Sequence, residues 1–350
     1  MILQYKARLE KIEDVLSEKL PAFFSEKWCR SFFGDIPASV SENFISSLIS
    51  PCRDLMLLGG KRWRPLLHVL CSELVSNAEP SYALVPLVEF VHTASLIHDD
   101  IEDGSDTRRG EPAAYIKYGM DAAINSGSWL YFAAAECIQS SDFPSEEKNI
   151  LYAIFFTELR RLHAGQAMDI YWHKNKDVIP SEEEYLSMTS LKTGTLASLA
   201  AKTGVILGHG SEDDAVFMGK AASSIGIGFQ ILDDVTNLTT GNKGKKRGDD
   251  IVEGKKSLPL ILHLKNKPDD LERILSCFER AEKEGINSSA IEECIGILSS
   301  SDAVSVAYER SRALILDTCR KISSKYPDSQ AAVLIGELFA GMLRPLEGIC

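Results

Sequence analysis

Apolar residues recur every three or four positions along most of the chain, and alternating β-branched runs are nearly absent. The helices that this pattern predicts span, approximately, residues 3–20, 40–58, 63–77, 82–103, 120–139, 145–172, 182–206, 212–237 and 255–265, with several more after residue 268. Glycine and proline separate them, for example at 59–60 and 143–144. Ser181, followed by three glutamates, predicts a helix N-terminus. Because no repeat or linker-like stretch is present, we expect one all-α domain of about a dozen helices over residues 1–350.

Composition narrows the class of protein. Of 350 residues, 45% are hydrophobic and 25% are charged, which is typical of a folded globular protein. The net charge of -12 would repel nucleic acid and anionic lipid in general, so we expect no nucleic-acid partner. The eight cysteines include no CxxC pair and no histidine at zinc spacing, which favours a reduced, cytoplasmic setting over a disulfide framework.

The sequence predicts neither a signal peptide nor a membrane span. The N-terminal residues run directly into a charged amphipathic pattern. The stretch 82–97, taken as the most apolar, is interrupted by Pro86, Glu89 and His92. We therefore expect no stable insertion into a membrane.

Two aspartate clusters carry the strongest chemical signal. Asp99 and Asp103 lie one helical turn apart on one face, where two carboxylates repel unless a cation lies between them. A solvated acidic face is the plain alternative, but these acids end an apolar helix. A related cluster at 233–237 again ends an apolar helix. Two such clusters, facing each other, would supply oxygen ligands for several Mg²⁺ ions.

Basic residues follow both clusters and also begin one helix. They are Arg108 and Arg109, residues 245–247, residues 255–256, and Lys61 with Arg64. Each group alone is typical of a solvated surface. Together with the aspartates they predict sites for two diphosphates, one chelated through metal ions and one held directly by lysine and arginine.

The order and spacing of five motifs resemble the trans-isoprenyl diphosphate (polyprenyl) synthase family, most clearly from residue 59 to about residue 259. The motifs are Gly60-Lys61-x-x-Arg64-Pro65, DDxxD-x4-RRG at Asp99 to Gly110, Gly165-Gln166-x-x-Asp169, Lys192-Thr193-Gly194 and Phe229-Gln230-x-x-Asp233-Asp234. Within the family the chain is most similar to the eukaryotic-type geranylgeranyl diphosphate synthases. Asn237 departs from the common second aspartate motif, although that subgroup shares the substitution.

The resemblance implies a fold and a reaction. The fold is an isoprenoid-synthase bundle around a deep central cavity. The reaction joins isopentenyl diphosphate head-to-tail to an allylic diphosphate (dimethylallyl, geranyl or farnesyl) with Mg²⁺, three ions for each active site. Ionisation of the allylic diphosphate is followed by condensation and loss of a proton. A homo-oligomer, dimer or higher, is also implied.

The resemblance further implies a role for each residue that matches a motif. The metal ligands are Asp99, Asp103 and Asp233, supported by Asp100, Asp234 and Asn237. The allylic diphosphate is bound by Arg108, Lys192, Thr193, Gln230, Lys245 and Lys255, with Lys246 as an alternative to Lys245. Isopentenyl diphosphate is bound by Lys61, Arg64, His92 and Arg109. The aspartate clusters and Lys192 are thus implied to be catalytic, and Gln166 and Asp169 are expected to orient Lys192.

Product length depends on the helix that ends at the first cluster. Ala94 and Ser95, five and four residues before Asp99, are small. In family members that stop at fifteen carbons, aromatic rings block the pocket at this level, so the resemblance implies a longer product here. Val88, on the same face farther down, is medium-sized. A floor is expected deeper, with four aromatic candidates: Trp129, Phe132, Phe155 and Phe156. The subgroup favours a twenty-carbon product, and a chain of twenty-five to forty carbons is the alternative.

Two other classes remain as rivals. A class I terpene cyclase would share the fold and the first cluster. However, its second metal-binding motif differs from the one in this sequence, and it would not need the second diphosphate site that this sequence predicts. A non-catalytic subunit of a heteromeric synthase would lose acids that both clusters here keep.

Overall fold

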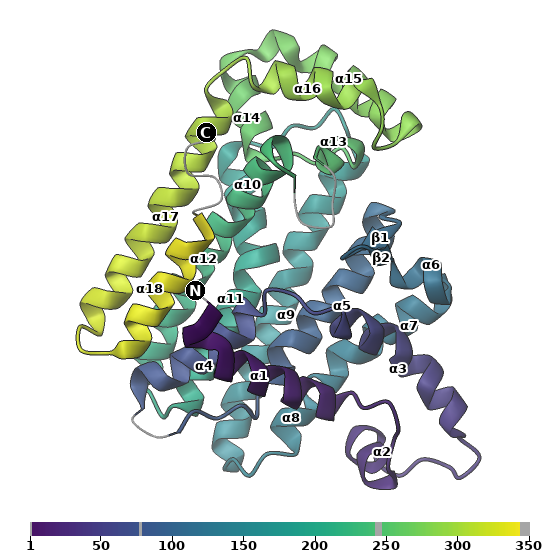
Figure 1. The fold of residues 1–350 in the computed structure, drawn as a ribbon, viewed down its shortest axis with the longest axis vertical. Helices are drawn as coiled ribbons and strands as arrows, with labels where there is room; N and C mark the ends of the chain where they lie inside the picture. The colour runs from purple at the N-terminus through teal and green to yellow at the C-terminus, as the bar shows by residue number, and fades with distance from the viewer. Residues whose placement is uncertain (1, 77–78, 242–246, 344–350) are drawn as a thin grey trace. The chain divides into compact units, whose positions relative to one another are not determined.

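The chain is mostly helical in the part that the computed structural model describes, which is residues 2–76, 79–241 and 247–343 (Figure 1). In this part the strands are two short antiparallel segments, β1 (Thr107–Arg108) and β2 (Glu111–Pro112). Seven cysteines in the described residues are free thiols. The all-α prediction is confirmed.

The chain packs as two compact units. Unit 1 comprises Met1–Glu158 and Leu199–Gly219, and unit 2 comprises Leu159–Ser198 and Lys220–Cys350. Each unit therefore combines segments that are far apart in sequence. The prediction of a single domain over 1–350 stays a prediction.

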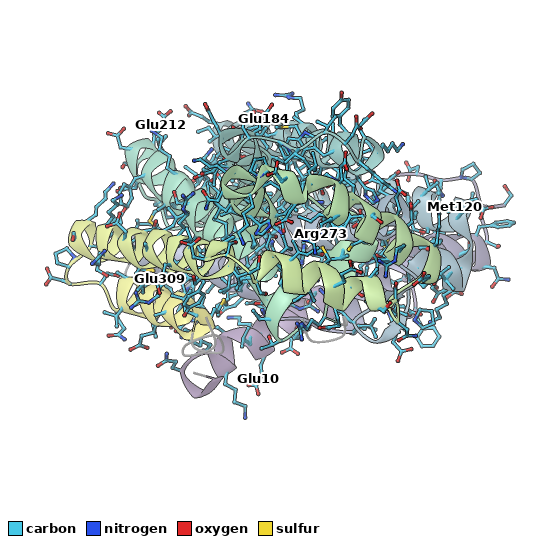
Figure 2. The ribbon with its side chains drawn as sticks, turned by 90° about the horizontal axis from the view of Figure 1, so that it is seen from above. Glu10, Met120, Glu184, Glu212, Arg273 and Glu309 are labelled. Carbon is cyan, nitrogen blue, oxygen red and sulfur yellow. The ribbon has the colours of Figure 1, made fainter. Side chains whose placement is uncertain are left out.

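Unit 1 holds the first aspartate cluster. Its helices are α1 (Ile2–Lys19), α2 (Glu26–Phe33), α3 (Glu42–Leu57), α4 (Trp63–Val75), α5 (Val85–Asp103), α6 (Ala114–Tyr118), α7 (Met120–Ala133), α8 (Glu136–Gln139) and parts of α9 (Ser145–Lys174), α11 (Thr195–Leu207) and α12 (Glu212–Thr239). Helix α1 buries Ile12 and Leu16 completely, whereas Glu10 is exposed on its outer side (Figure 2). Amphipathic patterning thus fixes which face of α1 packs on the unit.

Unit 2 holds the second cluster. Its helices are the rest of α9, α10 (Glu182–Thr189), the π-helix η1 (Ser190–Gly194), and parts of α11 (Thr195–Leu207) and α12 (Glu212–Thr239), followed by α13 (Asp249–Val252), α14 (Leu258–Asn266), the 3₁₀ turn η2 (Pro268–Asp270), α15 (Leu271–Glu284), α16 (Ser289–Leu298), α17 (Ala303–Lys325) and α18 (Gln330–Leu343). Helices α15 and α16 share an apolar core, which includes Ile274, Phe278 and Ile291. Helices α17 and α18 run side by side (Figure 1).

Each range predicted as helix contains a helix among the described residues, but several boundaries differ. The N-cap at Ser181 is confirmed, with a full capping box to Glu184. The predicted helix 182–206 contains η1, and 120–139 is divided into α7 and α8. The helix predicted from 255 begins at Leu258, because Ser257 is the N-cap and Pro259 occupies the first turn. Helices exceed the dozen expected because short ones, such as α2, α6 and α13, lack a long apolar period.

One helix in the described part of the chain, α12, has the length and hydropathy of a membrane span. Its most apolar window has a mean hydropathy of 1.3, so α12 rather than 82–97 is the closest match. However, 56% of that window is buried inside the protein. A buried core helix passes the same test, which makes this weak evidence for a span.

Candidate active site

The first aspartate cluster lies at the C-terminal end of α5, where Gly104 adopts the left-handed conformation that ends the helix. Asp99 and Asp103 are partly exposed, whereas Asp100 is buried. The Arg108 guanidinium donates to Asp100 Oδ1 through Nε at 2.7 Å and through Nη2, and it lies 3.7 Å from Asp99. Carboxylates at a helix C-terminus face the negative end of the helix dipole, so this position favours a bound cation.

The four side chains predicted to bind isopentenyl diphosphate all belong to unit 1. Arg109 adopts φ 56° and lies over Gly60, where a β-carbon would come within 3.0 Å of Nη2. It donates to the carbonyl oxygens of Gly59 and Leu55. Because glycine has no β-carbon, Gly60 allows the Arg109 guanidinium to approach the backbone here.

Burial and neighbouring charges lower the pKa values of two side chains in this basic group. Burial lowers the pKa of Arg64 to about 10, and its Nε is buried without a hydrogen-bond partner among the described residues. Burial and then the charges of Arg64 and Arg109 lower the pKa of His92 well below its usual value. His92 is therefore neutral at pH 7 and keeps one N–H donor. The unpaired N–H of Arg64 Nε, among other basic side chains, is suited to an anion.

Lys192 lies on η1 in unit 2. Its Nζ donates to Asp169 Oδ2 at 2.5 Å, as expected from the sequence. Helix α9 approaches closely at Gly165, where a β-carbon would be 2.3 Å from the Lys192 backbone nitrogen. Single π-helical turns are rare and often occur at functional sites. The motif glycine on α9 thus makes room for the lysine-bearing turn.

A chain of hydrogen bonds joins η1 to the second cluster. Thr193 Oγ1 donates to Gln230 Oε1 at 3.0 Å, and Gln230 Nε2 donates to Asp234 Oδ1 at 3.2 Å. Asp234 Oδ2 also accepts from Tyr185 Oη at 2.8 Å and from the Leu258 backbone N–H at 2.9 Å. Burial raises the pKa of Asp234 to about 6, and these hydrogen bonds oppose the rise.

Tyr185 is a residue of the second cluster that the sequence analysis missed. It is buried on α10 and lies 49 positions from Asp234 in sequence. A lone aromatic on the apolar face of a helix is indistinguishable from ordinary core, so no signal marked it. Asp233 is exposed, and Asn237 is buried, with an Oδ1 that has no hydrogen-bond partner in the described part of the chain.

Lys255 follows the second cluster. Its Nζ lies 2.5 Å from Glu253 Oε2, and burial raises the pKa of nearby Asp250 well above its usual value. Lys245 and Lys246 lie outside the described residues.

The residues expected to set product length lie along α5. Val88 and Ala94 are completely buried in unit 1. Ser95 is partly buried, and its hydroxyl donates to the His92 carbonyl oxygen at 2.8 Å. Phe132 and Phe156 are 74% and 45% exposed, so the expectation that either forms a buried floor is wrong. Their positions fall on outward faces of α7 and α9. Phe155 is completely buried, and Trp129 stacks on Phe33 at 5.8 Å.

The donor set fits Mg²⁺. No three or more His, Cys, Asp or Glu side chains converge on a common point within residues 2–76, 79–241 and 247–343. Mg²⁺ needs only one or two protein carboxylates, because it keeps waters and takes phosphate oxygens as further ligands. Asp99 and Asp103 provide such a pair. The two clusters belong to different units, so their facing each other stays a prediction.

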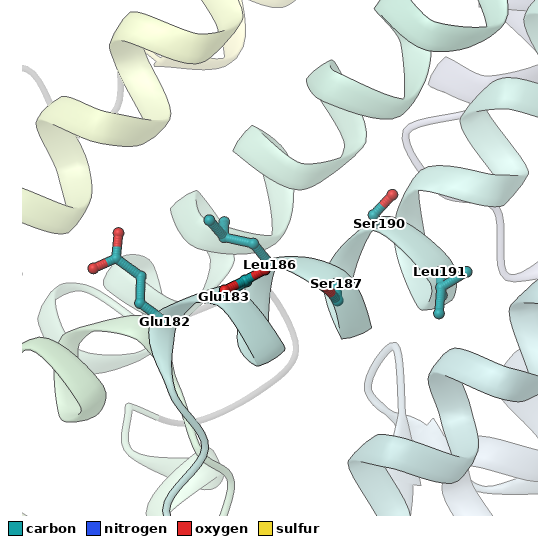
Figure 3. Close-up of a pocket in the computed structure, with 6 residues that line it drawn as sticks. All are labelled: Glu182, Glu183, Leu186, Ser187, Ser190 and Leu191. Carbon is teal, nitrogen blue, oxygen red and sulfur yellow. The ribbon is translucent and has the colours of Figure 1, made fainter.

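A separate hollow lies along α10 and η1 in unit 2 (Figure 3). Its lining residues are Glu182, Glu183, Leu186, Ser187, Ser190 and Leu191. None of them belongs to the predicted site. Glu182 forms an ion pair with Arg310, so part of this wall is already neutralised.

Comparisons with known proteins agree with the motifs. The polyprenyl synthetase family model matches residues 46–296. A geranylgeranyl diphosphate synthase from Sulfolobus acidocaldarius is 34% identical over 275 residues, which cover 74% of this chain and 83% of that protein. A geranylgeranyl pyrophosphate synthase from Apiospora sacchari is 33% identical over 258 residues, or 73% and 75% of the two chains. The crystal structure of geranylgeranyl pyrophosphate synthetase from Pyrococcus horikoshii has a TM-score of 0.82 at 28% identity, with 97% of each chain covered.

Proposed function

The chain belongs to the polyprenyl synthetase family, and we propose that it condenses isopentenyl diphosphate with an allylic diphosphate. One observation carries the proposal: each compact unit combines an aspartate cluster with its own basic side chains. Unit 1 gathers Arg64, His92 and Arg109 near the helix that ends in the first cluster, and unit 2 links Lys192 and Asp234 through hydrogen bonds. Two diphosphates are the ligands that such a duplicated arrangement suits.

The residues act on charge rather than as a covalent nucleophile. Lys192, Thr193 and Arg108 bind the allylic diphosphate and stabilise the negative charge that develops as its carbon–oxygen bond breaks. Arg64 and Arg109 hold isopentenyl diphosphate, whose double bond then attacks the allylic cation. A carbon–carbon bond forms, and one proton leaves to the departing diphosphate. Exclusion of water from the reacting carbons would protect the cation from hydrolysis.

Enzymes of this family are in general Mg²⁺-dependent, and Asp99, Asp103 and Asp233 are the residues that would hold the ions. Bound Mg²⁺ neutralises the diphosphate and makes it a better leaving group. We propose three ions for each active site. Asp100 supports the first cluster through its bonds to Arg108, and Asp234 supports the second through Gln230 and Tyr185.

Geranylgeranyl diphosphate is the product that the relatives favour. The relatives from Sulfolobus acidocaldarius and Apiospora sacchari are geranylgeranyl diphosphate (pyrophosphate) synthases by name. The small side chains of Ala94 and Ser95 support a product longer than fifteen carbons. A product of twenty-five to forty carbons is the alternative, and the narrower resemblance to the eukaryotic-type subgroup stays a prediction.

We also propose that the protein is cytoplasmic and that it forms a homo-oligomer. The second proposal rests on exposed apolar side chains. Five large apolar side chains of unit 1 are 43–74% exposed: Met120, Ile124 and Phe132 on α7, and Ile150 and Phe156 on α9. Exposed apolar side chains on neighbouring turns are typical of a subunit interface. A second copy of the chain would cover them.

Diphosphate release tests the proposal. The enzyme should release diphosphate from farnesyl or dimethylallyl diphosphate only when isopentenyl diphosphate is also present. Release from the allylic substrate alone would indicate a terpene cyclase instead. No release under either condition, with Mg²⁺ present, would indicate a non-catalytic subunit.

A further inference from the structure

Arg62 occupies an unusual position between two residues of the proposed isopentenyl diphosphate site, Lys61 and Arg64. It is the N-cap of α4 and adopts a left-handed backbone with φ 47°. Its side chain is only 2% exposed. Residues other than glycine are strained in this conformation, which persists only where surrounding contacts hold it.

The contacts of the Arg62 guanidinium come from three helices. Nη1 donates to Glu89 Oε1 on α5 at 2.5 Å. Nε and Nη2 donate to the two carboxylate oxygens of Glu13 on α1 at 2.7 and 3.1 Å. Nη2 also donates to the Met56 carbonyl oxygen, at the end of α3, at 2.6 Å. We name Arg62, Glu13 and Glu89 the arginine clamp.

The two glutamates stabilise the charged form of Arg62. Burial disfavours the charged form of Arg62, but the hydrogen bonds to Glu13 and the charges of Glu13 and Glu89 outweigh burial and raise its pKa. Glu89 is also close enough to Arg64 and Arg109 for their charges to oppose the rise that burial causes in its own pKa. The clamp is therefore linked to Arg64 and Arg109 in two ways. Arg62 is two residues from Arg64 along the backbone, and the charge of Glu89 interacts with the charges of both arginines.

We propose that Glu13 and Glu89 are positioning residues for isopentenyl diphosphate, because they hold Arg62 and thereby fix Lys61 and Arg64 at the start of α4. The inference rests on the proposed function. It gives α1 a role in substrate binding, although α1 precedes residues 46–296, the segment that matches the family model.

The chain contains a matched control. Arg8 on α1 donates to both carboxylate oxygens of Glu73 on α4, at 2.7 and 2.6 Å. This ion pair joins the same two helices as Arg62 and Glu13. However, Glu73 is eleven residues beyond Arg62, about 16 Å along the helix. Its loss should weaken the attachment of α1 without moving Lys61 and Arg64.

The experiment compares Glu13→Gln with Glu73→Gln. Steady-state kinetics give KM for each substrate, calorimetry gives binding of isopentenyl diphosphate alone, and urea denaturation gives stability. Glu13 is 45% exposed in the clamp, so the variant should fold. Glu13→Gln should raise KM for isopentenyl diphosphate about three- to tenfold, or about 0.7–1.4 kcal/mol, and leave KM for the allylic substrate within about twofold. Glu89→Gln should act in the same direction and more strongly. Glu73→Gln should change neither KM.

Equal effects of Glu13→Gln and Glu73→Gln, or equal effects of Glu13→Gln on both substrates, would overturn the clamp. The binding measurement separates this failure from failure of the proposed function. A wild-type protein that binds isopentenyl diphosphate without condensing it would contradict the proposed function, while the clamp would still be judged by whether Glu13→Gln weakens that binding more than Glu73→Gln does.

Discussion

Replacing Tyr185 with phenylalanine removes one hydrogen bond to the second cluster and almost nothing else. The hydroxyl donates to Asp234 Oδ2 at 2.8 Å in a completely buried setting, and phenylalanine fills the same space. A hydrogen bond to a charged group contributes about 1.5–3 kcal/mol. Asp234 keeps two donors, Leu258 and Gln230, so we expect the lower end of this range.

Two measurements should change together. The free energy of unfolding should fall by about 1.5 kcal/mol, and kcat/KM should fall about tenfold at pH 7. Since a donor to the carboxylate lowers its pKa, removing the donor raises the pKa of Asp234 above about 6, by about one unit for each 1.4 kcal/mol. The acid limb of the kcat/KM profile should therefore move to higher pH, and activity should recover partly at pH 9.

The assays are urea denaturation and a pH profile of kcat/KM. Tyr308→Phe is the control, because Tyr308 is a buried tyrosine on α17 of the same unit. A Tyr185→Phe enzyme with wild-type kcat/KM and an unmoved acid limb would refute the view that this hydrogen bond supports the cluster.

Four further predictions concern other parts of the molecule. Asp99→Ala should abolish turnover without unfolding the protein, and more than about a tenth of wild-type kcat/KM, a loss below about 1.4 kcal/mol, would contradict the metal assignment. Arg64→Ala should raise KM mainly for isopentenyl diphosphate and Lys192→Ala mainly for the allylic substrate; equal effects would show that the two sites are one. Burial lowers the pKa of His68 to about 4 from 6.5, so its contribution to stability is present above pH 6.5 and is lost as pH falls. Wild type should therefore lose about 2 kcal/mol more than His68→Gln between pH 7 and pH 5 in urea denaturation, and parallel losses would refute this. Ser95→Phe should shift the product to farnesol or shorter after dephosphorylation, and an unchanged product would mean that the chain does not pass Ser95.

The sequence predicted the helices because they leave a local pattern, and it identified candidate site residues whose roles stay predictions. The resemblance to the family led to the expectation that Asp169 orients Lys192, and Lys192 Nζ lies 2.5 Å from Asp169 Oδ2. The helices and the one-turn spacing of Asp99 and Asp103, by contrast, are visible in the sequence itself. Such regularities follow from the helical period, which a single sequence displays.

The remaining features depend on contacts between distant segments. Tyr185 reaches Asp234 across 49 residues, and Glu13 reaches Arg62 across another 49. In the sequence, these residues resemble an ordinary core aromatic and an ordinary surface acid. The π-helix at Ser190–Gly194 was hidden for a related reason, since it keeps the apolar period of the predicted helix while changing the local hydrogen bonding. Phe132 was misjudged because bulk alone does not reveal which face of α7 is exposed.

Chromatography of the dephosphorylated product tests the central claim most directly. Purified protein is incubated with farnesyl diphosphate, isopentenyl diphosphate and Mg²⁺, with each component omitted in turn. Condensation predicts geranylgeraniol as the main product, formed only when both substrates and the metal are present. A cyclised hydrocarbon formed from farnesyl diphosphate alone, or the absence of any longer alcohol, would contradict the account.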